Sequence, residues 1–140
     1  MSIKQISAFV ENKPGKVYEL FKVLADAGIN LRAMNIADTK DFGVLRLIVQ
    51  DVDKAKEVLG LDTIVVDTDV IAVEMVDEVG TLSGIIKTLS DASINIEYLY
   101  AFTTPTKNGA YTVIRTDDLE GSEKVLKENG YILLDQKDIA

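Results

Sequence analysis

The sequence predicts an α+β fold made of two copies of one βαββαβ unit, in which helices cover one face of an antiparallel sheet. The 140-residue chain repeats itself at an offset of 65 residues, so that Gly15 corresponds to Gly80 and Asn30 to Asn95. Strand-like and helix-like patterns follow one another in the same order in both copies. The composition, 47% hydrophobic and 27% charged, is that of an ordinary soluble globular protein. We therefore predict two ferredoxin-like domains, at residues 1–67 and 68–140.

The first copy begins with a strand and a helix. Residues 3–10 mix β-branched and aromatic side chains, and the turn-forming stretch 11–15 ends this strand. We place Pro14 in the first turn of the following helix, where its missing N–H is not needed. Gly28 is expected to end that helix in the left-handed conformation. The helix is predicted by an apolar stripe at helical spacing, which consists of Val17, Leu20, Phe21, Leu24 and Ala27.

The rest of the first copy is predicted to hold three strands and a short helix. Residues 31–39 and 44–50 form two strands joined by a turn. Asp53 is expected to cap a helix whose apolar side includes Ala55 and Leu59. Residues 63–66 make a last, separate strand.

The second copy repeats this order. Its predicted elements are a strand at 70–76, a helix whose stripe runs from Leu82 to Ala92, a hairpin of strands 98–104 and 111–116 around the turn 105–108, a helix at Val125 and Leu126, and a strand at 131–134. The join at residues 67–69 is too short for a flexible linker, so we expect the two copies to pack closely.

The absence of cysteine and histidine excludes several kinds of chemistry. Zinc fingers, iron–sulfur clusters, thiol nucleophiles and a Ser-His-Asp triad all need one of these residues. The acidic stretch 117–120 is interpreted as a solvated turn and helix start, where negative charge suits the helix dipole. We expect no metal site, no cofactor and no catalytic residues, so the protein is not expected to be an enzyme.

The charge and the apolar runs limit the partners. A net charge of −8 argues against binding to a nucleic-acid backbone, which depends on clustered Lys and Arg. No apolar run approaches the roughly 20 residues that a membrane span needs. The sequence opens directly into a strand-like pattern without a signal peptide, so a cytoplasmic location is expected.

The repeated glycine and asparagine pairs are the candidate binding residues. Gly15 and Gly80 fall where a strand gives way to a helix, so unpaired N–H groups are expected there and a ligand can come close. Asn30 and Asn95 lead into a strand, and a carboxamide can pair with both the carboxylate and the ammonium of one small molecule. Purely structural roles are the alternative: the glycines serve the turn, and the asparagines hydrogen-bond the local backbone.

The motif Asn12-Lys13-Pro14-Gly15, followed by a helix and then Ala27-Gly28-Ile29-Asn30-Leu31, resembles the ACT domain, a regulatory amino-acid-binding module. The stretch 77–82 with Ala92-Ser93-Ile94-Asn95-Ile96 is similar to the same motif. The second copy carries Val79 in place of the proline and Ser93 in place of the helix-ending glycine. The resemblance covers nearly the whole chain as a tandem pair.

The resemblance implies a ligand site. ACT domains commonly pair side by side into an eight-stranded sheet, and an amino acid is held between the loop of one domain and the asparagine segment of its partner. The implied ligand-binding residues are Asn12, Lys13, Pro14, Gly15, Lys16, Val17, Ile29, Asn30 and Leu31 in the first copy, and Glu78, Val79, Gly80, Thr81, Leu82, Ile94, Asn95 and Ile96 in the second.

We expect an amino-acid sensor that acts on a separate enzyme or transporter by stabilising one arrangement of its units. A free amino acid, a biosynthetic enzyme and a second copy in a homodimer are the candidate partners. The alternative is an assembly or dimerisation module with vestigial pockets. An acylphosphatase-like enzyme would need an arginine in the first loop, and an RNA-binding sheet would need basic charge. The sequence leaves the amino acid, the target and the number of working sites open.

Overall fold

The computed structural model describes residues 2–38, 41–76, 78–103 and 109–139. The chain forms two compact units, one built on Lys4–Thr68 and the other on Asp69–Asp138. The predicted turn at 105–108 and Asp77 of the second loop lie outside the described residues.

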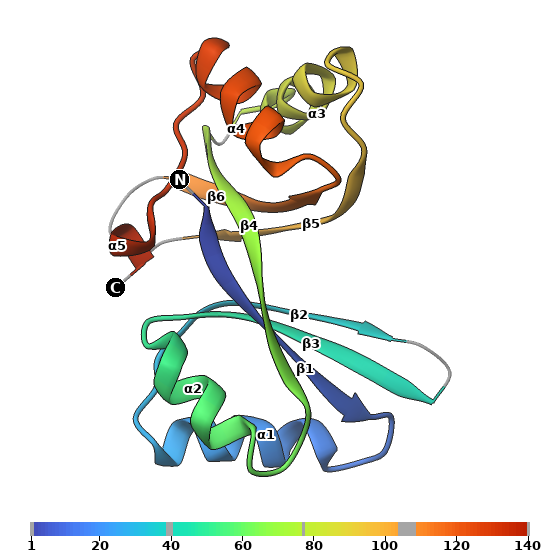
Figure 1. Ribbon diagram of the computed structural model, residues 1–140, viewed down its shortest axis with the longest axis vertical. Helices are drawn as coiled ribbons and strands as arrows, with labels where there is room; N and C mark the ends of the chain where they lie inside the picture. Colours follow the sequence, from blue (N-terminus) through green and yellow to red (C-terminus); the bar gives the residue numbers. More distant parts are fainter. Residues whose placement is uncertain (1, 39–40, 77, 104–108, 140) are drawn as a thin grey trace. The chain divides into compact units, whose positions relative to one another are not determined.

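In the first unit two helices cover one face of an antiparallel sheet (Figure 1). Its elements are β1 (Ile3–Glu11), α1 (Lys16–Asp26), β2 (Leu31–Asp38), β3 (Phe42–Val49), α2 (Val52–Leu59) and the start of β4 (Val65–Val76). The strand order is β2-β3-β1-β4, and Ala8 of β1 lies opposite Leu45 of β3. These two side chains form a core with Leu20 and Leu24 of α1 and Leu59 of α2. The predicted apolar stripe of the first helix is thereby confirmed.

The second unit repeats this architecture (Figure 1). It continues along β4 and contains α3 (Thr81–Asp91), β5 (Ile96–Thr103), β6 (Gly109–Thr116), α4 (Leu119–Glu128) and the short α5 (Gln136–Ile139). Its strand order is β4-β6-β5, and Ile71 of β4 lies opposite Ile114 of β6. They form a core with Ile85 and Leu89 of α3 and Leu126 of α4. The predicted α+β class, with βαββαβ units, is confirmed.

The first helix ends as predicted but begins later. Gly28 has a φ of +71°, which confirms the left-handed helix end. Pro14, however, lies in a turn before the helix, so its placement in the first turn was wrong. The cause is Gly15, whose φ of +87° takes the backbone out of the helical path between Pro14 and Lys16.

The cap of α2 also differs from the prediction. The Oδ1 atom of Asp51 accepts a hydrogen bond from the N–H of Lys54 at 3.1 Å, whereas Asp53 lies within the first turn. The helix thus begins two residues earlier than the sequence pattern suggested. In the second unit Asp118 caps α4 in the same way, accepting from the N–H of Gly121 at 3.0 Å, which confirms the predicted helix start.

The predicted break between the strands at 63–66 and 70–76 and the predicted last strand at 131–134 were wrong. Residues 65–66 and the strand expected at 70–76 belong to one continuous strand, β4, which runs through Asp67 and Asp69 without a break, whereas Thr63 and Ile64 precede it. The strand expected at 131–134 is only a bridge between Leu133 and Val73. That segment turns into α5 at Gln136, which leaves too few residues to extend the ladder.

Candidate functional site

The loop between the first strand and the first helix has the same structure in both units. Gly15 and Gly80 are left-handed, with φ of +87° and +92°. Matching hydrogen bonds flank them: Lys16 N–H donates to the Lys13 carbonyl at 3.3 Å, and Thr81 N–H donates to the Glu78 carbonyl at 3.3 Å. Apart from the adjacent residues, no described atom lies within 4 Å of the place where a Cβ would stand on either glycine, so the described part of each loop leaves that side open.

The helices that follow these loops begin without a side-chain cap. Among the described residues no side chain caps the N-terminus of α1 or α3, whereas α2 and α4 are capped by Asp51 and Asp118. The first N–H groups of a helix have no partner within the helix. The first turns of α1 and α3 therefore keep N–H groups available for an acceptor from outside, such as a carboxylate.

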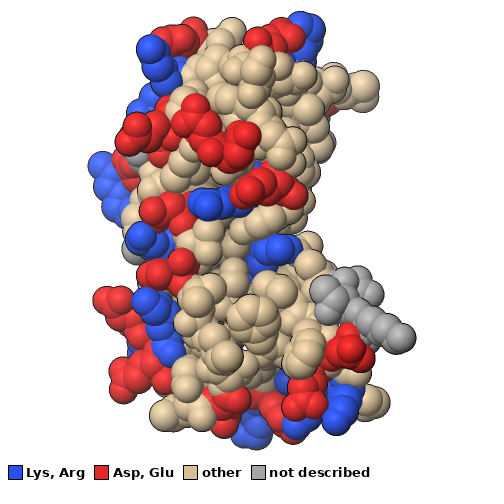
Figure 2. All heavy atoms as spheres, turned by 45° about the vertical axis from the view of Figure 1, so that its right-hand side comes forward, with Lys and Arg blue, Asp and Glu red and all other residues tan. Residues whose placement is uncertain are grey.

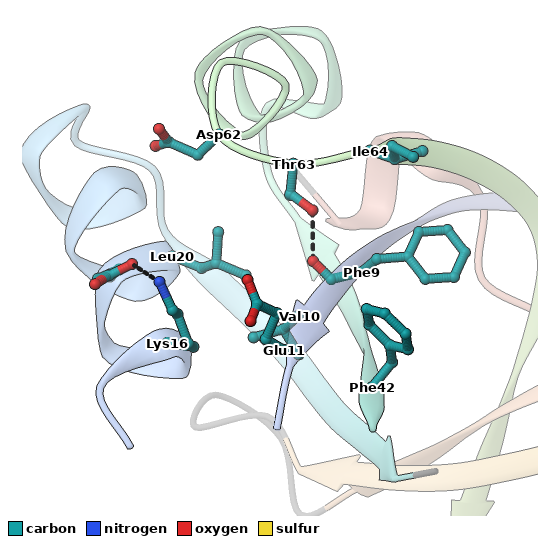
Figure 3. A pocket seen from close by; sticks show the side chains of 10 residues that line it. Phe9, Val10, Glu11, Lys16, Leu20, Phe42, Asp62, Thr63 and Ile64 are labelled. Atoms are coloured by element: carbon teal, nitrogen blue, oxygen red, sulfur yellow. Dashed lines mark hydrogen bonds and ion pairs between the residues drawn. The ribbon is translucent and has the colours of Figure 1, made fainter. Parts of the chain in front are cut away.

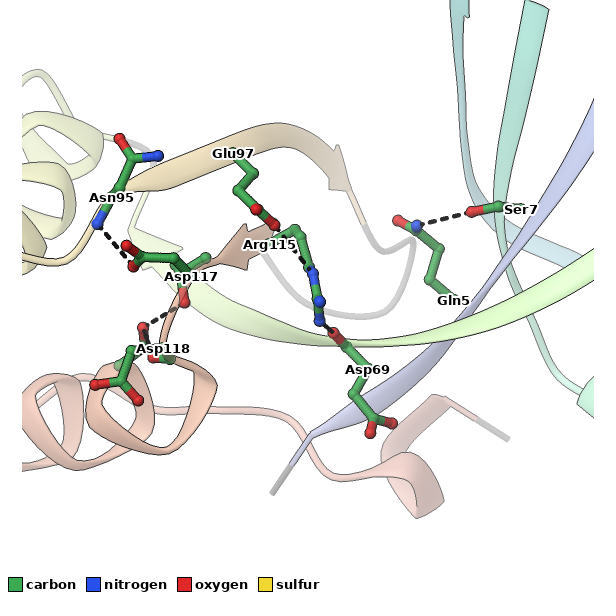
Figure 4. A network of polar contacts seen from close by, with 10 residues as sticks. Gln5, Ser7, Asp69, Asn95, Glu97, Arg115, Asp117 and Asp118 are labelled. Atoms are coloured by element: carbon green, nitrogen blue, oxygen red, sulfur yellow. Dashed lines mark hydrogen bonds and ion pairs between the residues drawn. The ribbon is translucent and has the colours of Figure 1, made fainter.

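The two asparagines are held by their backbones. The carbonyl of Asn30 accepts from the N–H of Gln50 at 3.3 Å, and the carbonyl of Asn95 accepts from the N–H of Asp117 at 3.1 Å. In the second unit the N–H of Asn95 also donates to Oδ1 of Asp117 at 3.0 Å (Figure 4). Both asparagines are exposed, and neither carboxamide forms a hydrogen bond with the part of the chain that the structure describes.

The apolar members of the predicted site face the cores. Ile29 is buried, with 8% of its surface exposed. Val17, Leu31, Ile94 and Ile96 are partly buried against the core of their own unit. These side chains support the position of the loops and the asparagines and offer little surface to a ligand. Asn12, Pro14, Glu78 and Val79 by contrast are exposed.

Both lysines of the first loop have acidic neighbours. The Nζ atom of Lys13 lies 3.2 Å from a carboxylate oxygen of Glu11, and that of Lys16 lies 3.7 Å from Glu19. Because both pairs are exposed, each is worth little in stability and is easily exchanged for a bound ligand.

A cavity of about 320 Å³ lies in the first unit, around the end of β1. It is bounded by the first turn of α1, the start of β3 and the segment between α2 and β4. Lys16 and Leu20 lie on one side of the end of β1, and the rings of Phe9 and Phe42 lie on the other (Figure 3). Of its lining residues only Lys16 was predicted as a site residue, because the others come from segments far apart in the sequence.

The fold and these paired loops define a tandem regulatory module. A family model for the ACT domain pair matches residues 1–140, and the chain belongs to that family. The predicted recognition of a tandem ACT protein is thereby confirmed. A search of curated proteins finds no match.

Solved structures show the same fold. Protein BT0572 from Bacteroides thetaiotaomicron is 40% identical, with a TM-score of 0.92, and the match covers 99% of this chain and 96% of that one. The ligand-free regulatory subunit of aspartate kinase from Thermus thermophilus is 17% identical, with a TM-score of 0.63 and coverage of 91% and 92%. The corresponding subunit from Thermus flavus is 18% identical, with a TM-score of 0.63 and coverage of 89% and 90%.

The surface charge and the apolar character of the helices concern two classes of partner, nucleic acids and membranes. The face drawn in Figure 2 carries Asp and Glu side chains interspersed with Lys and Arg. Among the helices in the described ranges, none has the length and apolar character needed to cross a bilayer.

Proposed function

We propose that the protein is a regulatory amino-acid-binding protein rather than an enzyme, and that it acts on a separate enzyme or transporter in the cytoplasm. The observation that carries this proposal is the pair of open, uncapped helix N-termini behind Gly15 and Gly80. Such N-termini suit a carboxylate, since the N–H groups and the helix dipole both favour an anion. The exposed carboxamides of Asn30 and Asn95 supply the donor and acceptor that a zwitterion needs.

The ligand contacts are proposed to come from the exposed loop residues and the two asparagines. Asn12, Lys13, Pro14 and Gly15 would contribute in the first unit, with Glu78, Val79 and Gly80 in the second. The shared architecture with regulatory subunits of aspartate kinase makes an enzyme of amino-acid metabolism a reasonable target.

The test is a thermal-shift screen of the whole protein against the twenty amino acids, followed by titration calorimetry. A ligand that binds only the folded state adds about 2.7 kcal/mol at a hundredfold excess over its Kd, which is readily detected. We expect one amino acid or a few related ones to shift the melting temperature, and Asn30→Ala or Asn95→Ala to remove the shift. No shift with any amino acid at millimolar concentration would refute the proposal.

An assembly module is the second candidate. It is favoured by Val79, which is fully exposed at the tip of the second loop where the first loop carries Pro14. Two exposed apolar residues on β2, an edge strand of the first unit, also favour it. Met34 is 54% exposed and Ile36 is 46% exposed. Under this reading Asn30→Ala and Asn95→Ala leave partner binding unchanged.

We also propose a homodimer, because a strand at the edge of a sheet offers unpaired backbone groups to a second copy. The molar mass measured by light scattering during size-exclusion chromatography tests this. Met34→Lys is the variant expected to shift the equilibrium toward the monomer. A single monomeric mass at all concentrations would contradict the dimer.

A further inference from the structure

The segment after α2 in the first unit corresponds residue by residue to the segment after α4 in the second. The N–H of Phe9 donates to the Ile64 carbonyl at 3.2 Å, and the N–H of Glu74 donates to the Ile132 carbonyl at 2.8 Å. Because Phe9 and Glu74 are equivalent in the repeat, Ile64 corresponds to Ile132. The preceding residue is Thr63 in one unit and Tyr131 in the other.

The facing position on the first helix also differs between the units. The N–H of Glu19 donates to the Gly15 carbonyl at 3.0 Å, and the N–H of Gly84 donates to the Gly80 carbonyl at 3.0 Å. Glu19 in the first unit therefore corresponds to Gly84 in the second.

In the second unit a tyrosine bridges these two positions. The hydroxyl oxygen of Tyr131 lies 2.9 Å from the point that a Cβ on Gly84 would occupy. Its side chain is partly buried and packs against the core of that unit. Tyr131 thus crosses from the segment after α4 to α3, and Gly84 is the residue that leaves room for it.

In the first unit the corresponding side chains, Thr63 and Glu19, line the space between them and do not fill it. The hydroxyl of Thr63 donates to the Phe9 carbonyl at 2.5 Å (Figure 3). Glu19 pairs with Lys16. The cavity of about 320 Å³ lies between these elements. The first unit therefore has a cavity at this place, whereas in the second unit the ring of Tyr131 occupies the equivalent space.

The residues that line the cavity favour binding of a cation that also has an apolar part. The carboxylates among them are Glu11, Glu19 and Asp62. Glu11 pairs with Lys13 and Glu19 pairs with Lys16, and both pairs are exposed. Asp62 forms no ion pair within the described residues. The rings of Phe9 and Phe42 add apolar surface on the other side of the end of β1 from Lys16. A volume of this size is typical of a small-molecule pocket.

We propose that this cavity is a binding site for a small organic ammonium ion with an apolar body, and that Tyr131 closes the counterpart in the second unit. The site goes beyond the proposed function because it does not use Asn30 or Asn95. Asn30 precedes the part of β2 that pairs with Val49, whereas the cavity contains Phe42 at the other end of β3. The ammonium can belong to a simple amine or to an amino acid.

Three probes with related branched alkyl chains separate these sources in titration calorimetry on the whole protein. Isoamylamine carries only the ammonium, 4-methylpentanoate carries only the carboxylate, and L-leucine carries both. We expect isoamylamine to bind once per chain and about tenfold or more tighter than 4-methylpentanoate. Binding of L-leucine at the same site assigns an amino acid, and its exclusion assigns an amine. Equal affinity for the amine and the carboxylate, or no binding of the amine, would overturn the proposal.

Substitutions test the location. The double variant Glu19→Gly/Thr63→Tyr places a tyrosine in the cavity, as Tyr131 is placed beside Gly84 in the second unit. It is expected to lower amine affinity about tenfold or more. Because this variant can misfold, Glu11→Gln/Asp62→Asn, at exposed positions, provides a second route to the same loss. Asp53→Asn/Glu57→Gln removes the same charge from exposed positions of α2 that do not line the cavity, and this matched control is expected to leave amine affinity unchanged. Amine binding that survives both double variants of the cavity overturns the proposal. An amino-acid response that survives them but is lost in Asn30→Ala supports the proposed function alone.

Discussion

Ser93 in the second unit occupies the left-handed backbone position that Gly28 occupies in the first. The φ angles are +59° and +71°, and both residues follow the C-cap residue of their helix, Ala92 and Ala27. The next residues close the helix in the same way: Ile29 N–H donates to the Leu24 carbonyl and Ile94 N–H to the Leu89 carbonyl, each at 3.0 Å. The two helix ends are therefore alike in geometry and unlike in conformational cost, because only glycine adopts this conformation without a Cβ clash.

This difference predicts that Ser93→Gly stabilises the protein. Relief of the left-handed strain is worth about 1–2 kcal/mol, and the extra freedom of glycine in the unfolded chain offsets about half of it. We expect a net gain of about 0.5–1 kcal/mol in the free energy of unfolding, measured by urea titration. Gly28→Ser is the matched control and should be destabilised by a similar amount. A loss of stability in Ser93→Gly would show that its side chain makes a compensating contact.

The helix caps give a prediction that separates two neighbouring aspartates. Asp51→Ala removes the acceptor for the N–H of Lys54 and should cost about 1 kcal/mol in unfolding free energy. Asp118→Ala should cost a similar amount in the second unit. Asp53→Ala, in the first turn of the same helix, should stay within about 0.5 kcal/mol of the parent. Equal effects at positions 51 and 53 would place the start of α2 elsewhere.

Gly15 links stability to ligand binding. Gly15→Ala introduces no clash with the described residues, since apart from the adjacent residues none of their atoms lies within 4 Å of the added Cβ, but it strains a backbone with a φ of +87°. We expect a loss of about 1–2 kcal/mol in unfolding free energy. Relaxation of the loop should also weaken binding of the amino acid found in the screen. Gly80→Ala has the same strain, so comparing ligand affinity in the two variants shows which loop binds. Full affinity in both would remove the loops from the site.

Asp67 makes stability depend on pH. The hydrogen bond from Lys56 Nζ to its Oδ2, at 3.1 Å, lowers the pKa of the Asp67 carboxyl below its usual 3.8, with further lowering by the charges of Lys56 and Lys4. A lowered folded pKa stabilises the native state above the unfolded pKa, and the contribution disappears as the pH falls through the folded pKa. Since the pair is more than a third exposed, Asp67→Asn should cost less than about 1 kcal/mol at pH 7.

Urea titrations of Asp67→Asn and its parent at pH 7 and pH 3 measure this difference. The gap between the two proteins should shrink at the lower pH and also at high salt, because the pair is exposed. Lys56→Gln should remove most of the effect of the Asp67 substitution. A gap that is independent of pH would mean that Asp67 acts through packing and not through its charge.

The helices were predictable because their signals are local. Leu20 and Leu24 face the core as their spacing indicates, and Gly28 ends its helix as its missing Cβ allows. The errors arose where two local solutions compete. Asp51 and Asp53 are both suitable caps, and the path of the chain from β3 selects the first. The polar residues Asp67 and Asp69 suggest a break, yet the strand continues through them.

The candidate site was predictable only in its loop. Gly15 and Gly80 were found through the repeat, and the structure gives both the same left-handed backbone. The cavity had no such signal. The Thr63 hydroxyl and the Phe9 carbonyl that form part of it are 54 residues apart, and Phe42 comes from a third segment. Neither a period nor a motif connects them.

By itself the sequence determined the repeat, the four main helices and the left-handed Gly28, because backbone preference and apolar periodicity act over a few residues. The tertiary structure alone decided that Thr63 leaves a hollow beside Glu19 while Tyr131 fills the equivalent space beside Gly84. The reason is physical: whether a space stays open depends on side chains that meet across the fold. Tyr131 and Gly84 come from distant segments of the second unit, and only the folded backbone brings them together.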